Sequence, residues 1–589
     1  MRAERIEKPA TGFRLSPNMP DYRAACQQFD WQPVKQELFG NYHRNGNDCC
    51  NLASLAVDRH VGAGRGDRIA LRLLTATGCH EVRFIELQRL VNQFANALQQ
   101  LQVERGERLF VLTGRRLELF VAVLGGLKYG MVVSPLYSAF GPEPLLTRLR
   151  LGEATVLVTT DGQYQRKLMD SRARAPTLRH VLLIRDRPDV PLPRDCEDFH
   201  LLTAEQRTSA EAAATTVNDP ALLHFTSGTT GTPKGALHVH GAALTHYLTG
   251  KYALDLHADD VFWCTADPGW VTGTSYGILA PLLHGVTSVI DAEEFDAERW
   301  YRILQSERVS VWYTAPTAIR LLMKAGDKLA QQFRLPSLRF VASVGEPLNA
   351  EAIWWSQSVL GLPIHDNWWQ TETGGIMIGN FPALPIKPGS MGMPLPGVEA
   401  AVVAADGTSL TIIDAPDVTG ELALRRGWPA MFRAYLGQDE RYRRSFIGDW
   451  YLTGDLVRRD ADGYYWFIGR KDDVIKSAGH LIGPFEVESV LMEHPAVAEA
   501  AVIGMPDALV GEVVMAFVSI KSGFASSEAL QRELLGHARK RLGAAVAPKT
   551  IRFVSTLPRT RSGKIMRRLL KARELGLPEG DLSTLEPSP

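Results

Sequence analysis

The sequence predicts an α/β protein with a large N-terminal domain and a smaller α+β C-terminal domain. Its 589 residues exceed what a single hydrophobic core usually holds. From about residue 67, strand-like and helix-like runs alternate, which favours largely parallel sheets covered by helices on both faces. After about residue 391, glycines and prolines become frequent and short alternating runs appear, which indicates antiparallel structure.

The first part of the alternation predicts one helix-covered sheet. Strand-like runs lie at 68–74, 109–112, 131–136, 155–159 and 181–184, and apolar residues at helical spacing predict helices over 87–101, from 117, and over 145–151. A buried strand at 221–225 then leads into a glycine-rich loop. Further strands at 261–264, 288–290, 310–313 and 340–343, separated by helical segments, predict a second helix-covered sheet.

The remainder of the chain divides into two smaller parts. Alternating runs at 399–403 and 420–424 predict a small β-barrel-like subdomain. A compact unit then follows in the order helix 484–493, strand 499–504, strand 513–520, helix 526–542 and strand 550–557. We therefore predict an N-terminal domain over 1–471 and a C-terminal domain over 472–589, joined near Asp472.

Composition excludes several classes of function. The 65 basic and 65 acidic residues balance, so nothing favours binding to nucleic acid or to an anionic membrane. The six cysteines show no C-x-x-C spacing, which argues against a disulfide framework and a zinc site. The N-terminal residues are charged, and the longest apolar run, near 119–127, is shorter than the roughly 20 residues of a membrane span. A cytoplasmic protein is expected.

The glycine-rich loop at 226–235, TSGTTGTPKG, is the strongest local signal in the chain. Its glycines allow the backbone to approach a ligand closely, and its hydroxyls and Lys234 could surround a polyphosphate. The loop is not a Walker A motif, because Pro233 stands where that pattern needs its second glycine. Taken alone, it could equally be an ordinary surface loop.

Four further motifs in order make the signal specific. They are YTAPT from Tyr313, WQTETG from Trp369, YLTGD from Tyr451, and PRTRSGK ending at Lys564. With the glycine-rich loop, they resemble the motifs of the adenylate-forming enzymes, a superfamily of acyl-CoA synthetases, luciferases and peptide-synthetase adenylation domains. The run WCTADPGWVTG at 263–273, the run SVGEP at 343–347 and the doubled tryptophan at 368–369 are most similar to acetyl-CoA synthetases.

The resemblance implies a two-step reaction and the residues that serve it. A carboxylate would attack the α-phosphorus of ATP to give an acyl-adenylate and pyrophosphate, and coenzyme A would then take the acyl group and release AMP. Lys564 would be the catalytic residue of the first step, delivered on a mobile C-terminal domain; otherwise its neighbouring arginines would form only a basic tail. The implied nucleotide-binding residues are Thr226, Ser227, Gly228, Thr229, Thr230, Gly231, Lys234, Gly345, Glu346, Pro347, Asp366, Asn367, Trp368, Trp369, Gln370, Thr371, Asp455 and Arg470.

The resemblance also implies sites for a metal, the acyl group and coenzyme A. Glu372 would bind Mg²⁺, and a structural cation could lie near Met492, His494 and Val497, although a His-Pro turn there is more often structural. The acyl pocket would be walled by Trp270, Val271, Thr272, Val344 and Trp369. Because an indole at 369 leaves room for little more than a methyl group, acetate should lead, propionate should be weaker and butyrate should fail. Coenzyme A would contact Thr272, Ala478, Gly479 and Arg539, and Asp472 would be the hinge residue.

Two departures from the family pattern leave alternatives open. Leu481 stands where acetyl-CoA synthetases usually carry an arginine that contacts the phosphates, and residues 150–195 lack an arginine-glycine cluster for coenzyme A. A propionate or other short-chain ligase, and a nucleotide-binding protein with impaired catalysis, therefore remain alternatives; a protein that loads a carrier domain is less favoured. In relatives the lysine at 564 is an acetylation target, so an acetyltransferase and deacetylase acting on Lys564 are possible partners, while the oligomeric state is not predicted.

Overall fold

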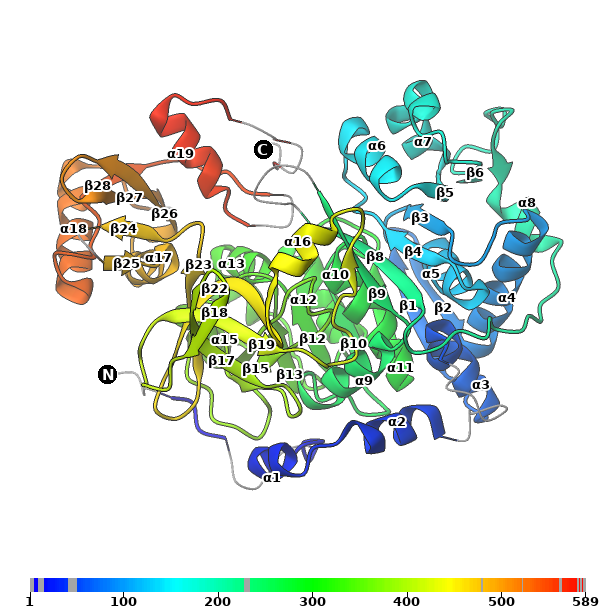
Figure 1. The fold of residues 1–589 in the computed structure, drawn as a ribbon, viewed down its shortest axis with the longest axis horizontal. Helices are drawn as coiled ribbons and strands as arrows, with labels where there is room; N and C mark the ends of the chain where they lie inside the picture. The colour runs from blue at the N-terminus through cyan, green and yellow to red at the C-terminus, as the bar shows by residue number, and fades with distance from the viewer. Residues whose placement is uncertain are drawn as a thin grey trace.

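The computed structural model describes residues 5–8, 15–40, 50–226, 233–477, 480–521, 523–560, 564–579, 582 and 585. Figure 1 shows the two predicted parts: a large assembly of sheets and helices, and a smaller C-terminal unit, drawn orange to red, beside it. Among the described residues, no helix has both the length and the apolar character that crossing a membrane requires.

The first large sheet carries the strands that flank the glycine-rich loop. Its described strands lie in the order β20-β9-β8-β4-β3-β5-β6-β7. Their bounds are β3 Arg108–Leu112, β4 Val132–Pro135, β5 Ala154–Thr160, β6 His180–Ile184, β7 Glu197–Asp198, β8 Pro220–Thr226, β9 Lys234–Val239 and β20 Ala434–Tyr435. Strands β3 to β8 pair in parallel, as predicted, whereas β8 and β9 form an antiparallel pair.

The second large sheet carries most of the later predicted strands. Its described order is β16-β15-β14-β13-β12-β10-β11-β1-β2. Their bounds are β1 Ile69–Thr75, β2 Gly78–Arg83, β10 Val261–Cys264, β11 Thr287–Asp291, β12 Val311–Thr314, β13 Phe340–Ser343, β14 Ile364–Trp368, β15 Ile378–Gly379 and β16 Met393–Pro394. Grouping the strand at 68–74 with the first sheet was wrong: β1 pairs in parallel with β11, about 220 residues further along the chain.

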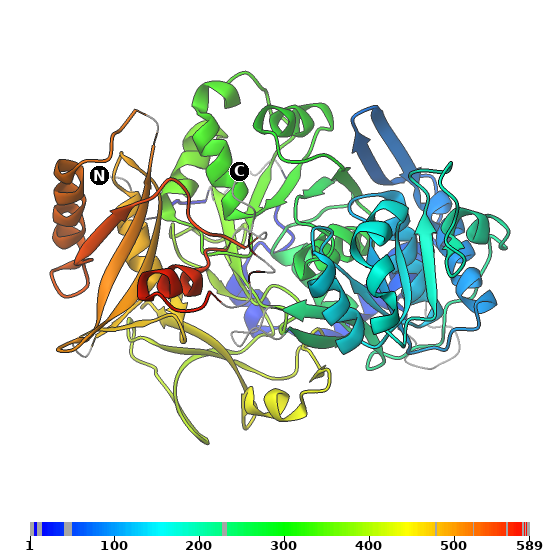
Figure 2. The same ribbon diagram turned by 90° about the horizontal axis from the view of Figure 1, so that it is seen from above.

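Helices cover both faces of these sheets (Figure 2). They are α1 Tyr22–Gln27, α2 Trp31–Phe39, α3 Arg59–Gly62, α4 Phe84–Gln100, α5 Leu117–Tyr129, α6 Pro142–Leu151, α7 Asp161–Lys167, α8 Phe199–Ala204, α9 Ala242–Tyr252, α10 Val271–Thr274, α11 Ala280–His284, α12 Ala297–Ser306, α13 Pro316–Ala325, α14 Asp327–Ala330 and α15 Ala350–Val359. Two π-helical turns, Ser54–Asp58 and Ser275–Leu279, and a 3₁₀ turn, Met169–Arg174, complete this part.

Alternate side chains of each strand enter different cores, because successive residues of a strand point to opposite faces. In β3, Leu109 and Val111 pack into a core shared by both sheets, whereas Phe110 and Leu112 pack under α6 and α7. The outer face of the second sheet is buried under α12, α13 and α15. This arrangement explains why the strands read as continuous apolar runs rather than alternating ones.

An antiparallel sheet occupies the place of the predicted β-barrel-like subdomain. Its described strands lie in the order β18-β17-β19-β22-β21, and β23 also pairs with β22. Their bounds are β17 Ala400–Asp406, β18 Ser409–Ile412, β19 Gly420–Arg425, β21 Phe446–Ile447, β22 Trp450–Arg459 and β23 Tyr465–Arg470, and α16 spans Asp439–Arg444.

The C-terminal unit has a sheet and a core of its own. Its elements are β24 Ile475–Ser477, β25 His480–Ile482, α17 Pro484–Met492, β26 Val497–Asp507, β27 Gly511–Ile520, α18 Glu528–Leu542, β28 Thr550–Phe553 and α19 Arg567–Leu575. Its predicted elements are present in the predicted order, with a β24–β25 hairpin before them and α19 after them. The domain boundary at 471/472 stays a prediction.

Candidate functional site

One cavity of about 1410 Å³ lies between the large N-terminal part and the C-terminal unit. Most of the residues named from the sequence line it. They are Thr226, Lys234, Trp270, Val271, Thr272, Val344, Gly345, Glu346, Pro347, Asp366, Asn367, Trp368, Trp369, Gln370, Thr371, Glu372, Asp455, Arg470, Met492 and Lys564. Residues far apart in the chain therefore meet at the ends of parallel strands, where open α/β sheets bind ligands.

The glycine-rich loop connects two neighbouring strands at the cavity. Thr226 ends β8 and Lys234 begins β9, and the two residues are paired in the antiparallel register. Ser227, Gly228, Thr229, Thr230 and Gly231 lie outside the described residues. Burial lowers the pKa of Lys234, while the nearby Glu372 carboxylate raises it. An ammonium group held here would gain from a neighbouring anion such as a phosphate.

Asp455 is a carboxylate of the cavity that three side-chain donors hold. It lies on β22 opposite Arg470 on β23, and its Oδ1 accepts a hydrogen bond from Arg470 Nη1 at 2.7 Å. Trp368 Nε1 and Gln370 Nε2 donate to Asp455 Oδ2 at 2.8 and 3.0 Å. Burial raises the pKa of Asp455, and these donors oppose that change. The carboxylate is thus fixed in orientation and faces the cavity.

The doubled tryptophan separates two regions of the site. Trp368 is buried and bonded to Asp455. Trp369 Nε1 donates to the Tyr313 hydroxyl at 3.3 Å, and its ring meets that of Tyr276 edge-on at 5.2 Å. Trp368 therefore supports Asp455, whereas Trp369, which lines the cavity together with Val344, is held by two tyrosines.

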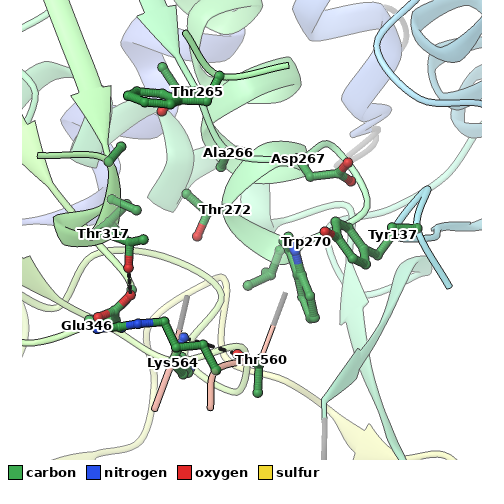
Figure 3. A pocket seen from close by; sticks show the side chains of 18 of the residues that line it. Tyr137, Thr265, Ala266, Asp267, Trp270, Thr272, Thr317, Glu346, Thr560 and Lys564 are labelled. Atoms are coloured by element: carbon green, nitrogen blue, oxygen red, sulfur yellow. Dashed lines mark hydrogen bonds between the residues drawn. The ribbon is translucent and has the colours of Figure 1, made fainter. Parts of the chain in front are cut away.

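Trp270, Val271 and Thr272 also line the cavity; Trp270 is the N-cap residue of α10, and Val271 and Thr272 are its first two residues. Figure 3 shows Trp270, Thr272, Tyr137 and Asp267 gathered on one side of the cavity. The Trp270 ring lies 5.0 Å from that of Tyr137. Aromatic rings thus line this part of the cavity, which we call the acyl lobe (Trp270, Val271, Thr272, Val344 and Trp369) and which suits a small apolar group.

Glu372 is held by a residue from a distant strand. Tyr435 OH donates to Glu372 Oε1 at 2.6 Å, and Phe432 N donates to the Glu372 carbonyl oxygen at 3.0 Å. Lys234 Nζ lies 5.3 Å from the centre of the Tyr435 ring. A single carboxylate close to Lys234, at the end of the glycine-rich loop, fits Mg²⁺, which usually binds one or two carboxylates together with waters and substrate phosphates.

The described residues contain no group of three or more His, Cys, Asp or Glu side chains that could hold a metal ion. In the predicted structural-cation turn, His494 Nε2 lies 3.2 Å from Glu533 Oε1, and Ala496 N donates to His494 Nδ1 at 3.3 Å. The His494 carbonyl oxygen accepts a hydrogen bond from Val497 N at 3.0 Å. A cation at Met492, His494 and Val497 stays a prediction.

Lys564 is an exposed residue on the loop that follows β28, and it lines the cavity. Its backbone N donates to Thr560 Oγ1 at 3.1 Å, while Thr560 N donates to the Lys564 carbonyl oxygen at 2.7 Å. In Figure 3, Lys564 lies beside Thr560 and Glu346 at the edge of the cavity. The C-terminal unit thus places Lys564 at the edge of the cavity, near Glu346.

Several predicted residues are not brought into the cavity. Arg539 lies exposed on α18, and Asp472 is an exposed residue just after β23, with Oδ1 3.5 Å from Arg470 Nε. Ala478 and Gly479 lie outside the described residues. Leu481 pairs through its backbone with Lys476 in the β24–β25 hairpin. The roles of these residues in coenzyme A binding and hinge motion stay predictions.

Comparison with known proteins now decides the family. The family model described as "AMP-binding enzyme" matches residues 57–436, and the one described as "AMP-binding enzyme C-terminal domain" matches residues 486–564. The chain belongs to the AMP-binding enzyme family.

Curated relatives in this family cover nearly the whole chain. An acetyl-coenzyme A synthetase of Bacillus subtilis is 44% identical over 571 residues, covering 97% of this chain and 98% of that protein. The acetyl-coenzyme A synthetase of Methanothrix thermoacetophila is 39% identical, covering 96% of this chain and 88% of that protein.

Solved structures of AMP-binding enzymes have the same architecture. A Brucella canis acyl-CoA synthetase has a TM-score of 0.73 at 35% identity, covering 94% of this chain and 99% of that one. An anthranilate CoA ligase, AuaEII, in complex with anthranoyl-AMP has a TM-score of 0.81 at 31% identity, covering 90% and 98%.

Sequence reasoning missed several residues of this AMP-binding enzyme's cavity. Arg115, Arg116 and Arg166 line it, and Arg115 Nη2 donates to the Thr265 carbonyl oxygen at 2.9 Å. The signal was present, since Arg115 and Arg116 follow the carboxyl end of β3. Tyr435 carried no such signal, because only tertiary pairing of β20 with β9 brings it to Glu372.

Proposed function

We propose that this chain is an AMP-forming acetate–CoA ligase that uses ATP, Mg²⁺ and coenzyme A. The observation that carries the proposal is the single cavity in which Lys564, Lys234, Asp455 and Trp369 meet. Its membership of the AMP-binding enzymes and its 44% identity to an acetyl-coenzyme A synthetase support the same reaction.

The first half-reaction needs positioning and charge neutralisation. A carboxylate is already ionised near pH 7, so its attack on the α-phosphorus needs no general base. An acyl–O–phosphorus bond forms while the bond to pyrophosphate breaks. Lys234 and Lys564, which both line the cavity, supply positive charge to the phosphates. Asp455, fixed by Arg470, accepts hydrogen bonds from the ribose hydroxyls, and the loop at 345–347 borders the adenine.

Mg²⁺ bound near Glu372 would neutralise charge on the departing pyrophosphate. Tyr435 holds the Glu372 carboxylate toward the cavity, because its hydroxyl occupies Oε1. The other carboxylate oxygen then remains for the cation. With only one oxygen of Glu372 left to bind it, the metal would be held mainly by substrate phosphates and water.

The second half-reaction transfers the acetyl group to sulfur. The thiol of coenzyme A loses its proton to water, and its sulfur forms a bond to the acyl carbon. The carbon–oxygen bond to AMP breaks, and AMP leaves with the electron pair on its phosphate oxygen. Thr272 lines the cavity beside the acyl group. Arg115, Arg116 and Arg166, which also line the cavity, would attract the phosphates of coenzyme A. They would supply the positive charge that an arginine-glycine cluster in residues 150–195 provides in some relatives.

Trp369 is the basis for choosing acetate over longer acids. Its indole is fixed by the Tyr313 hydroxyl and the Tyr276 ring, so it cannot turn aside without losing both contacts. Each methylene forced against such a wall should disfavour an acid by about 1–3 kcal/mol. Propionate is therefore the second candidate, disfavoured by one such step.

The test is product analysis with acetate, propionate and butyrate in the presence of ATP, Mg²⁺ and coenzyme A. We expect acetyl-CoA with equimolar AMP and pyrophosphate, less product from propionate and almost none from butyrate. Formation of ADP, or a preference for butyrate, would contradict the proposal. Binding of ATP with no product from any acid would favour an impaired nucleotide-binding protein instead.

We further propose that Lys564 is open to reversible acetylation by an acetyltransferase and a deacetylase. Its side chain is exposed on a loop, and acetylation would remove the charge that neutralises the phosphates. Protein carrying acetyl-lysine at 564 should lose adenylate formation but keep transfer from supplied acetyl-adenylate to coenzyme A. Equal loss of both half-reactions would argue against this role.

A further inference from the structure

A row of charges of alternating sign crosses the boundary between the two domains. Two members come from the N-terminal part: Arg320 Nη2 lies 2.7 Å from Glu346 Oε2. Two come from the C-terminal unit: Arg559 Nη2 lies 2.8 Å from Glu499 Oε1. The two pairs meet where Arg320 Nε lies 3.9 Å from Glu499 Oε1.

These four side chains are shielded from solvent. Relative exposure of the side chains is 16% for Arg320, 11% for Glu346, 28% for Glu499 and 9% for Arg559. Attraction between charges is stronger in such surroundings than at an open surface. The row therefore contributes to holding the domains in this arrangement, unlike an exposed surface pair.

Arg320 has a donor available for the cross-domain contact. Its Nη2 donates to Glu346 Oε2 and to Thr317 Oγ1, at 2.7 and 3.0 Å. Its buried Nε makes no hydrogen bond to any other described residue and faces Glu499. A guanidinium group can bind one carboxylate with one edge and a second with another, so Arg320 can serve Glu346 and Glu499 together.

A second cross-domain contact lies beside the first. Asn349 Nδ2, just before α15, donates to Ser489 Oγ on α17 at 3.1 Å. Asn349 is 7% exposed. The two contacts fix β26 of the C-terminal unit against α13, and α17 against Asn349, which borders the cavity.

The row leads directly to Lys564. Arg559 is paired with Ile565 through an isolated β-bridge, and Thr560 makes two hydrogen bonds to the backbone of Lys564. Glu499 holds Arg559, and the backbone pairing of residues 559–560 with residues 564–565 therefore fixes the position of Lys564. Figure 3 shows the result: Lys564 and Thr560 lie next to Glu346 and its partner Thr317.

We propose that the Arg320–Glu499 pair positions Lys564 for adenylate formation by holding the C-terminal unit in the arrangement seen here. Glu499 is a positioning residue, since it acts through Arg559 and the domain boundary. The proposal rests on the function proposed above. It assigns the Arg320–Glu499 pair to adenylate formation only. Transfer of the acetyl group to coenzyme A should not need the pair, if the two domains separate for that step.

The test compares the two half-reactions in Glu499→Gln, which keeps the shape of the side chain and removes its charge. Acetate-dependent ATP–pyrophosphate exchange should fall about tenfold, the effect of losing one shielded charge contact. Transfer of acetyl from supplied acetyl-adenylate to coenzyme A should stay within about twofold of the parent. The proposal is overturned if both rates fall equally, or if neither changes.

The matched control is Glu574→Gln. Glu574 forms an ion pair with Arg552 inside the C-terminal unit and makes no ion pair with a described residue of the N-terminal part. It should leave the ratio of the two half-reactions unchanged even if stability decreases. A shift of that ratio in the control as large as in Glu499→Gln would overturn the proposal.

A double-mutant cycle isolates the pair from other effects of each change. Arg320→Gln will itself lower exchange, because Arg320 also binds Glu346. In the Arg320→Gln background, Glu499→Gln should lower exchange by clearly less than it does in the parent, because only the contact of Glu499 with Arg559 is then left to lose. An equal effect in both backgrounds would contradict direct coupling. If the parent itself shows no acetate-dependent exchange, the proposed function fails; if the parent is active and the ratio does not shift, only the positioning role fails.

Discussion

Replacing Trp369 by glycine should enlarge the acyl lobe and extend the range of acids. A fully buried tryptophan removes about 150–250 Å² from water, which at about 25 cal/mol per Å² corresponds to about 4–6 kcal/mol. Trp369 is only half-buried, so we expect unfolding free energy to fall by about 2–3 kcal/mol, near the low end for large-to-small changes. Tyr313 OH keeps its hydrogen bond to Asn367 Oδ1 at 2.9 Å, so no buried hydroxyl loses its last partner.

The change in specificity follows from the same geometry. Butyrate has two methylenes more than acetate. In Trp369→Gly, the cost of about 1–3 kcal/mol for accommodating each methylene should disappear. The butyrate-to-acetate ratio of kcat/KM should therefore rise at least about thirtyfold, while kcat/KM for acetate falls as its methyl group loses the indole contact.

The assay is AMP release with straight-chain acids of increasing length, and urea unfolding measures the stability change. Trp466→Gly is the matched control, because Trp466 is also half-buried but does not line the cavity. An unchanged butyrate-to-acetate ratio in Trp369→Gly would refute the assignment of this indole to the acyl wall. An equal rise in Trp466→Gly would refute it as well.

Two further predictions concern the surroundings of the cavity. Tyr435→Phe removes the hydroxyl that donates to Glu372. The Mg²⁺ concentration for half-maximal exchange should therefore rise severalfold, and calorimetry of ATP binding should show a stronger dependence on Mg²⁺. An unchanged Mg²⁺ dependence would contradict the metal role of Glu372. Burial lowers the pKa of His246 to about 4, so the unfolded chain binds a proton that the folded chain excludes, and stability falls as pH drops from about 6.5 to about 4, by up to about 3 kcal/mol for this group. Urea unfolding of His246→Asn should therefore show a shallower loss of stability at acid pH than the parent, and an equal slope would contradict this.

Local pattern was sufficient to find most of the elements. The strands at 261–264 and 340–343 appear with those bounds, and the periodic run at 87–101 forms α4, because burial of one apolar face decides both. Which strands are neighbours could not be read in the same way. The placement of β1 beside β11 depends on tertiary packing across more than 200 residues.

The site was predictable where a motif carries the residue. Thr226 and Lys234, at strand ends, and Asp455, within β22, all line the cavity. The different roles of Trp368 and Trp369 follow from the geometry at the end of β14, where one indole reaches Asp455 and the next reaches Tyr313. Contacts such as Tyr435–Glu372 and Arg320–Glu499 join residues with no local pattern in common, so only the folded structure reveals them.

The central claim is that this cavity forms an acyl-adenylate from acetate and that Lys564 serves that step. Its most direct test is acetate-dependent exchange of pyrophosphate into ATP without coenzyme A, comparing the parent with Lys564→Ala. We expect exchange in the parent, its loss by about 10²-fold or more in the variant, and transfer from supplied acetyl-adenylate preserved in both. Exchange that survives in Lys564→Ala, or that is absent from the parent with every short acid, would contradict the account.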